Sequence, residues 1–209
     1  MDNPWKHIDL GEYESHMRLD SVGQLQAISR MTGDQLARYP VKTAAILGVA
    51  GGNGLEHAAA GQFEAIYGID VNPAYLAECG RRFPHLAGVL RLVEADVSDP
   101  LARLPRAELV VANLFVEYVG CAAFARAALK MEARYVSSGI QIDAGKDFVS
   151  DSPYMRIFDG LSAIHASVDE TALAARMREA GYESILREEE PLPNGKELVR
   201  LDFRRSEVK

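Results

Sequence analysis

The stretch that decides the fold of this chain is AAILGVAGGNGLE, residues 44–56. A short apolar run ends there in a glycine-dense turn, and the residues that follow predict a helix over 53–60. Glycine permits positive φ and lets a ligand approach the main chain, and a helix starting at such a turn directs free N–H groups at that ligand. A second apolar run, 65–69, ends at Asp70, whose carboxylate is placed to accept hydrogen bonds from a ribose diol. This order of features predicts a nucleoside-cofactor site.

Strand-like and helix-like segments alternate along the rest of the chain. We expect strands at 44–49, 65–69, 89–94, 108–112 and 133–141, and helices at 53–60, 73–83 and 120–131, with a further short helix between the third and fourth strands. Two last strands, 182–189 and 197–204, flank an Asn-Gly turn, which predicts a hairpin. The pattern indicates an α/β fold: a Rossmann-like, doubly wound, mostly parallel sheet of seven strands with a C-terminal antiparallel hairpin and helices on both faces.

Two capping boxes predict where further helices begin. Ser21 with Gln24 predicts a helix over 21–38, and Ser167 with Glu170 predicts one over 167–180. The segment 143–165 has no clear period and is long for a structureless connection, so we expect a loop that shapes a pocket.

Composition limits the classes of function. The 209 residues suit one domain, and a net charge of −7 disfavours nucleic acid as a partner. Cys79 and Cys121 lie far apart outside any C-x-x-C or His/Cys cluster, so we expect neither a disulfide framework nor a metal site. The chain begins without a signal-peptide pattern, and its apolar runs are too short to cross a bilayer. These features predict a cytoplasmic protein.

The glycine turn does not fit a dinucleotide fingerprint. A G-x-G-x-x-G frame starts at Gly52, but His57 stands where the third glycine is needed. None of the eight tyrosines has lysine four residues later, as a short-chain dehydrogenase would require. An NAD(P)-dependent oxidoreductase therefore remains only as an alternative.

Four successive motifs resemble those of class I S-adenosylmethionine-dependent methyltransferases: GVAGGNG (48–54), GIDVNP (68–73), EADVSDP (94–100) and LVVANLFVEYVG (109–120). The resemblance covers about residues 40–205 and implies S-adenosylmethionine as the cofactor and methyl transfer as the reaction. It departs from the family at the first motif, acidic-x-G-x-G-x-G. Gly48 stands at the acidic position and Ala50 at the first glycine, so Glu56 or the N-terminal segment would supply the missing charge.

The resemblance also implies which residues bind the cofactor. Asp70 would accept the ribose hydroxyls, Asp96 would accept the adenine amino group, and Asn113 would lie beside the sulfonium. Either aspartate, taken alone, is equally compatible with an ordinary carboxylate that caps a loop. The implied set comprises Gly48, Ala50, Gly52, Asn53, Gly54, Asp70, Val71, Asn72, Ala95, Asp96, Val97, Asn113 and Leu114.

The methyl acceptor is expected to be a small molecule. In small methyltransferases an N-terminal segment often folds over the cofactor, so we divide the chain into a helical lid segment, 1–40, and a Rossmann-like domain, 41–209. Tyr13, Met17 and Tyr118 would then line the pocket. Candidate general bases are Glu117, His16 and His165, although each also suits a structural or surface role. A non-catalytic cofactor-binding module is a second alternative, and the oligomeric state stays open.

Overall fold

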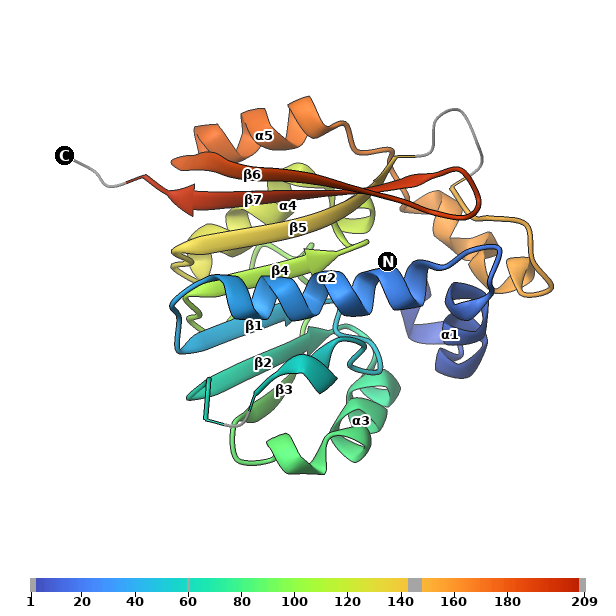
Figure 1. Ribbon diagram of the computed structural model, residues 1–209, viewed down its shortest axis with the longest axis horizontal. Coiled ribbons are helices and arrows are strands. Elements are labelled where there is room, and N and C mark those ends of the chain that lie inside the picture. Colours follow the sequence, from blue (N-terminus) through green and yellow to red (C-terminus); the bar gives the residue numbers. More distant parts are fainter. Residues whose placement is uncertain (1–2, 60, 143–147, 207–209) are drawn as a thin grey trace.

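The computed structural model describes residues 3–59, 61–142 and 148–206. Seven strands form one sheet in the order β3-β2-β1-β4-β5-β7-β6 (Figure 1). The strands are β1 Thr43–Leu47, β2 Ala65–Asp70, β3 Leu90–Glu94, β4 Leu109–Asn113, β5 Tyr135–Ile142, β6 Tyr182–Pro191 and β7 Glu197–Arg205. Strands β1 to β5 pair in parallel, whereas β7 runs antiparallel to both β5 and β6. The expected Rossmann-like sheet with its closing hairpin is confirmed.

Two pairs of helices cover the two faces of this sheet (Figure 1). On one face, α2 Gln24–Arg38 and α3 Pro73–Arg82 pack on an apolar layer that includes Leu36, Ile46 and Leu76. On the other face, α4 Val116–Lys130 and α5 Glu170–Glu179 pack on a second layer. Because the central strands β1 and β4 are buried on both sides, their sequences are almost continuous apolar runs.

The N-terminal segment lies beyond the carboxyl ends of the parallel strands (Figure 1). It contains the 3-10 helix η1 Pro4–His7 and the helix α1 Leu10–Arg18, which meet another 3-10 helix, η4 Met155–Ala163. Together they bury an apolar cluster whose members are Ile8, Phe158 and Leu161, with Trp5, Tyr13 and Tyr118 packed against it. Two parts of the chain that are far apart in sequence therefore close over one edge of the sheet.

Two predicted helices are wrong. After the glycine turn the chain forms a single 3-10 turn, η2 Leu55–His57, where a helix over 53–60 was expected. The helix α2 already packs against this segment. Gly33 of α2 lies so close to His57 that a Cβ atom there would collide with its ring, and a Cβ atom at Gly54 would collide with Thr32 of α2. The short helix expected between β3 and β4 is replaced by turns and extended chain, in a stretch that Pro100 and Pro105 interrupt.

The two predicted capping boxes do not form. The helix α2 starts at Gln24 behind Gly23, whose φ of 67° closes a tight turn with its N–H on Leu19 O at 2.8 Å. The N-cap of α5 is Asp169, whose side chain accepts from Thr171 N at 3.0 Å. A tight turn and a nearer aspartate thus replaced the expected serine caps.

Helix α4 and the loop after β5 also differ from the expectation. Helix α4 begins at Val116, four residues early, and Gly120 interrupts it with φ 78° and ψ 154°. In the segment predicted as a loop, residues 143–147 lie outside the described residues, whereas Met155–Ala163 form η4.

Candidate functional site

A cavity opens where β1, β2 and β4 end, between the strand ends and the N-terminal segment; we call it the first cavity. It gathers most of the predicted cofactor-binding residues from four separate motifs: Gly48, Ala50, Asp70, Val71, Ala95, Asp96, Val97, Asn113 and Leu114. Parallel strands that end side by side bring these loops together, as is usual for ligand sites in such sheets.

The glycine turn forms the floor of the first cavity. Gly48 has φ 68°, and its N–H donates to Ile69 O at 2.8 Å, which ties the turn to β2. A Cβ atom at Gly48 would lie 2.7 Å from the Phe115 ring, so a larger residue would not fit. Ala50 has φ 45°, a left-handed conformation that is uncommon for a residue other than glycine. Its N–H donates to Asp70 Oδ2 at 2.9 Å, which holds the turn in this shape.

Asp70 lies at the end of β2 and is buried. Besides the Ala50 N–H, it accepts from Asn72 N at 2.9 Å. Burial raises the pKa of Asp70, and these backbone hydrogen bonds offset part of the rise. Tyr75 of α3, another lining residue of this cavity, is buried, and its hydroxyl has no hydrogen-bond partner among the described residues. A buried hydroxyl without a partner is costly unless a ligand hydrogen-bonds to it.

Asp96 also lines the first cavity, and its sequence neighbours Ala95 and Val97 add apolar side chains to the lining. It accepts from Ser98 Oγ at 2.6 Å and from Asn3 Nδ2 at 3.2 Å. Burial opposes ionisation, but these hydrogen bonds keep the pKa of Asp96 below its usual value. The first cavity therefore presents an ionised acceptor beside apolar side chains.

The remaining residues of the predicted cofactor set shape the frame of the site. A Cβ atom at Gly52 would collide with Phe83, and one at Gly54 with Thr32. Asn53 Nδ2 donates to Leu25 O at 2.9 Å, which links the turn to α2. Asn72 caps α3, and its Nδ2 donates to Trp5 O at 2.9 Å. The two glycines allow the turn to pack closely against Phe83 and Thr32. The two asparagines tie the turn to α2 and the start of α3 to the N-terminal segment.

A second cavity adjoins the first and shares four lining residues with it: Trp5, Tyr13, Leu114 and Tyr118. All three candidate bases, Glu117, His16 and His165, line this second cavity, as does Met17. The structure thus brings together acid–base candidates that are up to 149 positions apart in sequence, next to the cavity that holds the two aspartates.

The candidate bases differ in their surroundings. Glu117 is buried at the start of α4, and its Oε1 accepts from Gln141 N at 2.8 Å. His16 is buried near the end of α1, with Nδ1 2.7 Å from Ser152 Oγ. Burial, and then the nearby charge of Lys196, lower the pKa of His16, which keeps its ring neutral at pH 7. His165 stacks on Phe148 with ring centroids 4.1 Å apart.

Three aromatic residues line both cavities. Trp5 packs edge-on against Tyr118 at 4.9 Å and against Tyr13 at 5.4 Å between centroids. Burial, and then the charge of Asp70, raise the pKa of Tyr13, so its hydroxyl stays protonated. Such rings form an apolar wall with few polar groups.

Sequence reasoning missed several residues of the two cavities, namely Asn3, Tyr75, Phe115, Ile164, Gln24 and Phe148. For Tyr75 a signal existed, because the residue lies in the first turn of a helix that starts directly after Asp70 and Asn72. Asn3, Ile164 and Phe148 reach the site because parts of the chain that are far apart in sequence pack together, and no local sequence pattern predicts such packing.

Solved structures share this architecture at low sequence identity. The magnesium protoporphyrin IX methyltransferase of Synechocystis, solved with bound S-adenosylmethionine, is 12% identical, with a TM-score of 0.65 over 88% of this chain and 81% of its own. The N-methyltransferase NodS of Bradyrhizobium japonicum, solved with S-adenosylhomocysteine, is 17% identical, with a TM-score of 0.63 over 94% and 99% of the two chains. The chain has the class I methyltransferase fold.

This fold by itself does not set the reaction. The cyclase SpnF is 12% identical to this chain, with a TM-score of 0.65 over 87% of this chain and 82% of its own. No protein-family model and no curated protein sequence matches the chain. Function must therefore be argued from the two cavities.

Two further findings concern the described residues. They contain no group of three or more His, Cys, Asp or Glu side chains arranged to hold a metal ion. Within the same part of the chain, every helix is too short or too polar to span a bilayer.

Proposed function

We propose that this protein is an S-adenosylmethionine-dependent methyltransferase that acts on a small-molecule acceptor. The observation that carries the proposal is the pair of adjoining cavities, one lined by Asp70 and Asp96 and the other by Glu117, His16 and His165. A transfer reaction needs such a donor site next to an acceptor site, with the reacting groups held close together.

The residues of the first cavity fit the proposed cofactor. The unsatisfied hydroxyl of Tyr75 and the carboxylate of Asp70 offer hydrogen bonds to a ribose, while Asp96 offers an acceptor beside the apolar walls Ala95 and Val97. Gly48 leaves room for close approach to the main chain. When bound, S-adenosylmethionine supplies a methyl group on a positively charged sulfur.

The second cavity would hold the acceptor. Its aromatic wall, formed by Trp5, Tyr118 and Phe148, would orient the acceptor and exclude water. Glu117 and His16 would accept the proton that an acceptor hydroxyl or amine loses on methylation. If Nδ1 of His16 donates to Ser152, its Nε2 remains as the proton acceptor.

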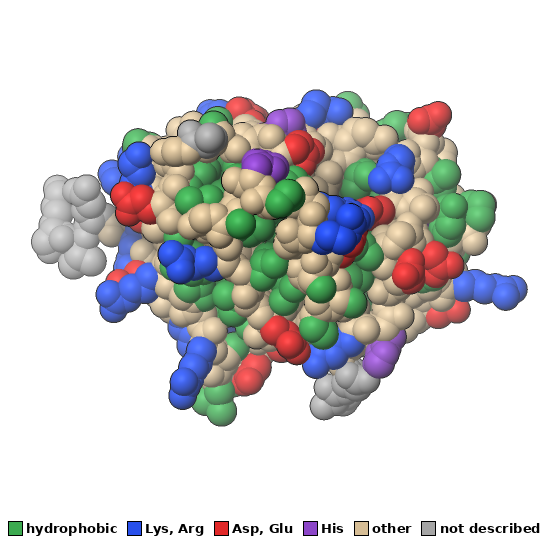
Figure 2. Space-filling model, turned by 90° about the horizontal axis from the view of Figure 1, so that it is seen from below, with side chains coloured by type: hydrophobic (Ala, Val, Ile, Leu, Met, Phe, Trp, Pro, Cys, Tyr) green, Lys and Arg blue, Asp and Glu red, His purple; other side chains and the backbone are tan. Residues whose placement is uncertain are grey.

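The N-terminal segment supports a small acceptor rather than a polymer. We propose that residues 3–18 act as the lid, because η1 and α1 cover both cavities while α2 belongs to the layer packed on the sheet. Acidic and basic side chains are interspersed on the face that Figure 2 shows, without a broad basic patch there. With a net charge of −7, this surface offers little attraction to a phosphate backbone.

A thermal-shift titration tests the proposal, with S-adenosylmethionine, S-adenosylhomocysteine, NAD and NADP in parallel. A ligand at about one hundred times its Kd stabilises the fold by about 2.7 kcal/mol, which is readily seen. We expect both adenosyl sulfur compounds to raise the Tm. A rise with the nicotinamide cofactors alone would establish an oxidoreductase instead, and binding without turnover on any acceptor class would favour a non-catalytic module.

A further inference from the structure

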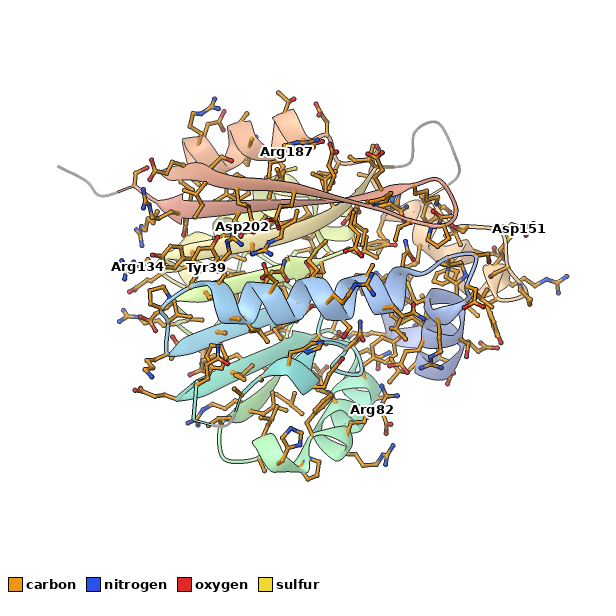
Figure 3. The ribbon with its side chains drawn as sticks, in the orientation of Figure 1. Tyr39, Arg82, Arg134, Asp151, Arg187 and Asp202 are labelled. Atoms are coloured by element: carbon orange, nitrogen blue, oxygen red, sulfur yellow. The ribbon has the colours of Figure 1, made fainter. Side chains whose placement is uncertain are left out.

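Glu14 of α1 and Arg82 of α3 meet above Gly51 of the glycine turn. Arg82 Nη2 donates to Glu14 Oε2 at 3.0 Å, and Arg82 Nη1 donates to Glu14 Oε1 and lies 3.5 Å from Gly51 O. Glu14 is buried, with its side chain 10% exposed, and the Arg82 side chain is 32% exposed. Figure 3 labels Arg82 at the end of α3 that lies below α1. The pair therefore joins the N-terminal segment to the nucleotide-binding half of the sheet.

The glycine at position 51 lets this ion pair approach the turn. A Cβ atom there would collide with both Glu14 Oε1 and Arg82 Nη1. Glu14 also lines a further hollow, the turn cavity, together with Gly51 and Asn53. The turn cavity continues the first cavity, because Tyr13, Gly48, Ala50 and Asn113 line both. Glu14 therefore lies where the first cavity extends past the glycine turn, and Arg82, which is not among the lining residues of either cavity, holds the Glu14 carboxylate there.

The first motif lacks a carboxylate of its own. Gly48 stands at its acidic position, and a side chain there would strike Phe115. The proposed cofactor carries an ammonium and a carboxylate on its amino-acid end, and both need charged partners when they leave water. Glu14 supplies a carboxylate from outside the motif, and Arg82 holds that carboxylate in place.

We propose that Glu14 accepts hydrogen bonds from the ammonium of the cofactor and that Arg82 positions the Glu14 carboxylate for this contact. The proposal rests on the function proposed above and deepens it. Glu14 keeps capacity for a ligand, since a carboxylate offers about four acceptor positions, whereas the guanidinium of Arg82 already donates to Glu14 and, through Nε, to Glu78 Oε1. The ion pair thereby distinguishes the complete cofactor from nucleosides that lack the amino-acid end, and it couples that recognition to the position of α1.

Calorimetric titration with two ligands tests this role. S-adenosylhomocysteine carries the amino-acid end, whereas 5′-methylthioadenosine lacks it. We expect Glu14→Gln to raise the Kd of S-adenosylhomocysteine about tenfold or more, because a hydrogen bond between charged groups is lost. The Kd of methylthioadenosine should change less than about twofold. Arg82→Gln should show the same selectivity, and Arg81→Gln, an exposed neighbour that pairs with Glu78, is the matched control.

The possible outcomes separate the explanations. Equal weakening of both ligands by Glu14→Gln and by Arg82→Gln would show that the pair only fastens α1 in place, and would overturn the proposal. Unchanged binding of S-adenosylhomocysteine would also overturn it. A wild-type protein that binds neither ligand would instead refute the proposed function. Circular dichroism fixes the folded fraction of each variant, so the ratio of the two Kd values is compared between folded proteins only.

Discussion

Asp70 links the shape of the glycine turn to the proposed ribose site. Its carboxylate accepts from Ala50 N and Asn72 N, and it lines the first cavity at the same time. Ala50 would not hold its left-handed conformation without this partner. One side chain therefore sets the backbone that a cofactor would approach.

We expect Asp70→Ala to weaken S-adenosylhomocysteine binding by at least about tenfold and to lower the free energy of unfolding by about 1–3 kcal/mol, because two backbone N–H groups lose their acceptor. Calorimetry and urea denaturation measure the two effects. Asp99→Ala is the control, since Asp99 accepts from a backbone N–H in an exposed turn. Full binding by Asp70→Ala would contradict the assignment of Asp70 to the site.

His16 makes stability depend on pH. Its pKa is lowered in the folded protein by burial and by Lys196, so the folded state favours the neutral ring. The contribution of the neutral ring to the free energy of unfolding is complete above the ordinary histidine pKa of about 6.5. It is lost as the pH falls below that value towards the lowered pKa of the folded state. Urea denaturation between pH 5 and 8 should show a smaller pH dependence in His16→Gln than in wild type. His85 is an exposed histidine. If His85→Gln reduced the pH dependence of stability as much as His16→Gln does, His16 would not be its source.

At the scale of elements, β7 carries a buried charged network that fastens α2 to the sheet. Arg200 Nη2 donates to Asp202 Oδ2 at 2.6 Å, and Arg200 also pairs with Asp34 of α2. Tyr39 donates to Asp202 Oδ2 at 2.6 Å, and Ser137 of β5 donates to Asp202 Oδ1. Figure 3 labels Tyr39 and Asp202 near one another behind α2. Asp202 therefore joins β5, β7 and the end of α2.

Removing one partner of this network should lower the free energy of unfolding more than removing both partners does. We expect Asp202→Ala to destabilise the fold by about 3–5 kcal/mol, because it leaves the guanidinium of Arg200 buried without its main partner. The double variant Arg200→Met with Asp202→Leu should lose less, and thermal unfolding compares the two. A double variant as unstable as the single one would show that packing, rather than the unpaired charge, sets the cost.

Local patterns predicted the strands well and the helices less well. The apolar run of β1 and the Asn-Gly turn before β7 lie where their sequences placed them, because strand burial and turn chemistry are local properties. The helix expected after the turn failed because α2, which precedes it in the chain, fills the same face of the sheet. Likewise the motifs located Asp70 and Asp96, whereas Tyr75 and the approach of Glu14 to Gly51 depend on how helices pack.

At the scale of the whole molecule, the N-terminal segment and η4, which are far apart in sequence, close over the site together. Trp5 contacts Tyr118 through its ring and Asn72 through its carbonyl, so η1 is fastened to both α3 and α4. It is the chain's only tryptophan, and it lines both cavities. Its fluorescence consequently reports on the region where donor and acceptor would meet.

We expect S-adenosylhomocysteine to change the emission of Trp5 in a saturable titration, with the same Kd that calorimetry gives. Asp96→Ala should shift that titration to higher concentration, because the ligand loses an acceptor in the first cavity. A calorimetric binding signal that leaves the fluorescence unchanged would place the ligand away from the N-terminal segment, contrary to the proposed lid.

The most direct test of the central claim is a crystal structure of the protein with S-adenosylhomocysteine. We predict that the adenine amino group lies within hydrogen-bond distance of Asp96, the ribose hydroxyls within the same distance of Asp70, and the sulfur beside Asn113, facing the second cavity. Density for the ligand outside the first cavity, or a first cavity that stays empty at saturating ligand, would contradict the account.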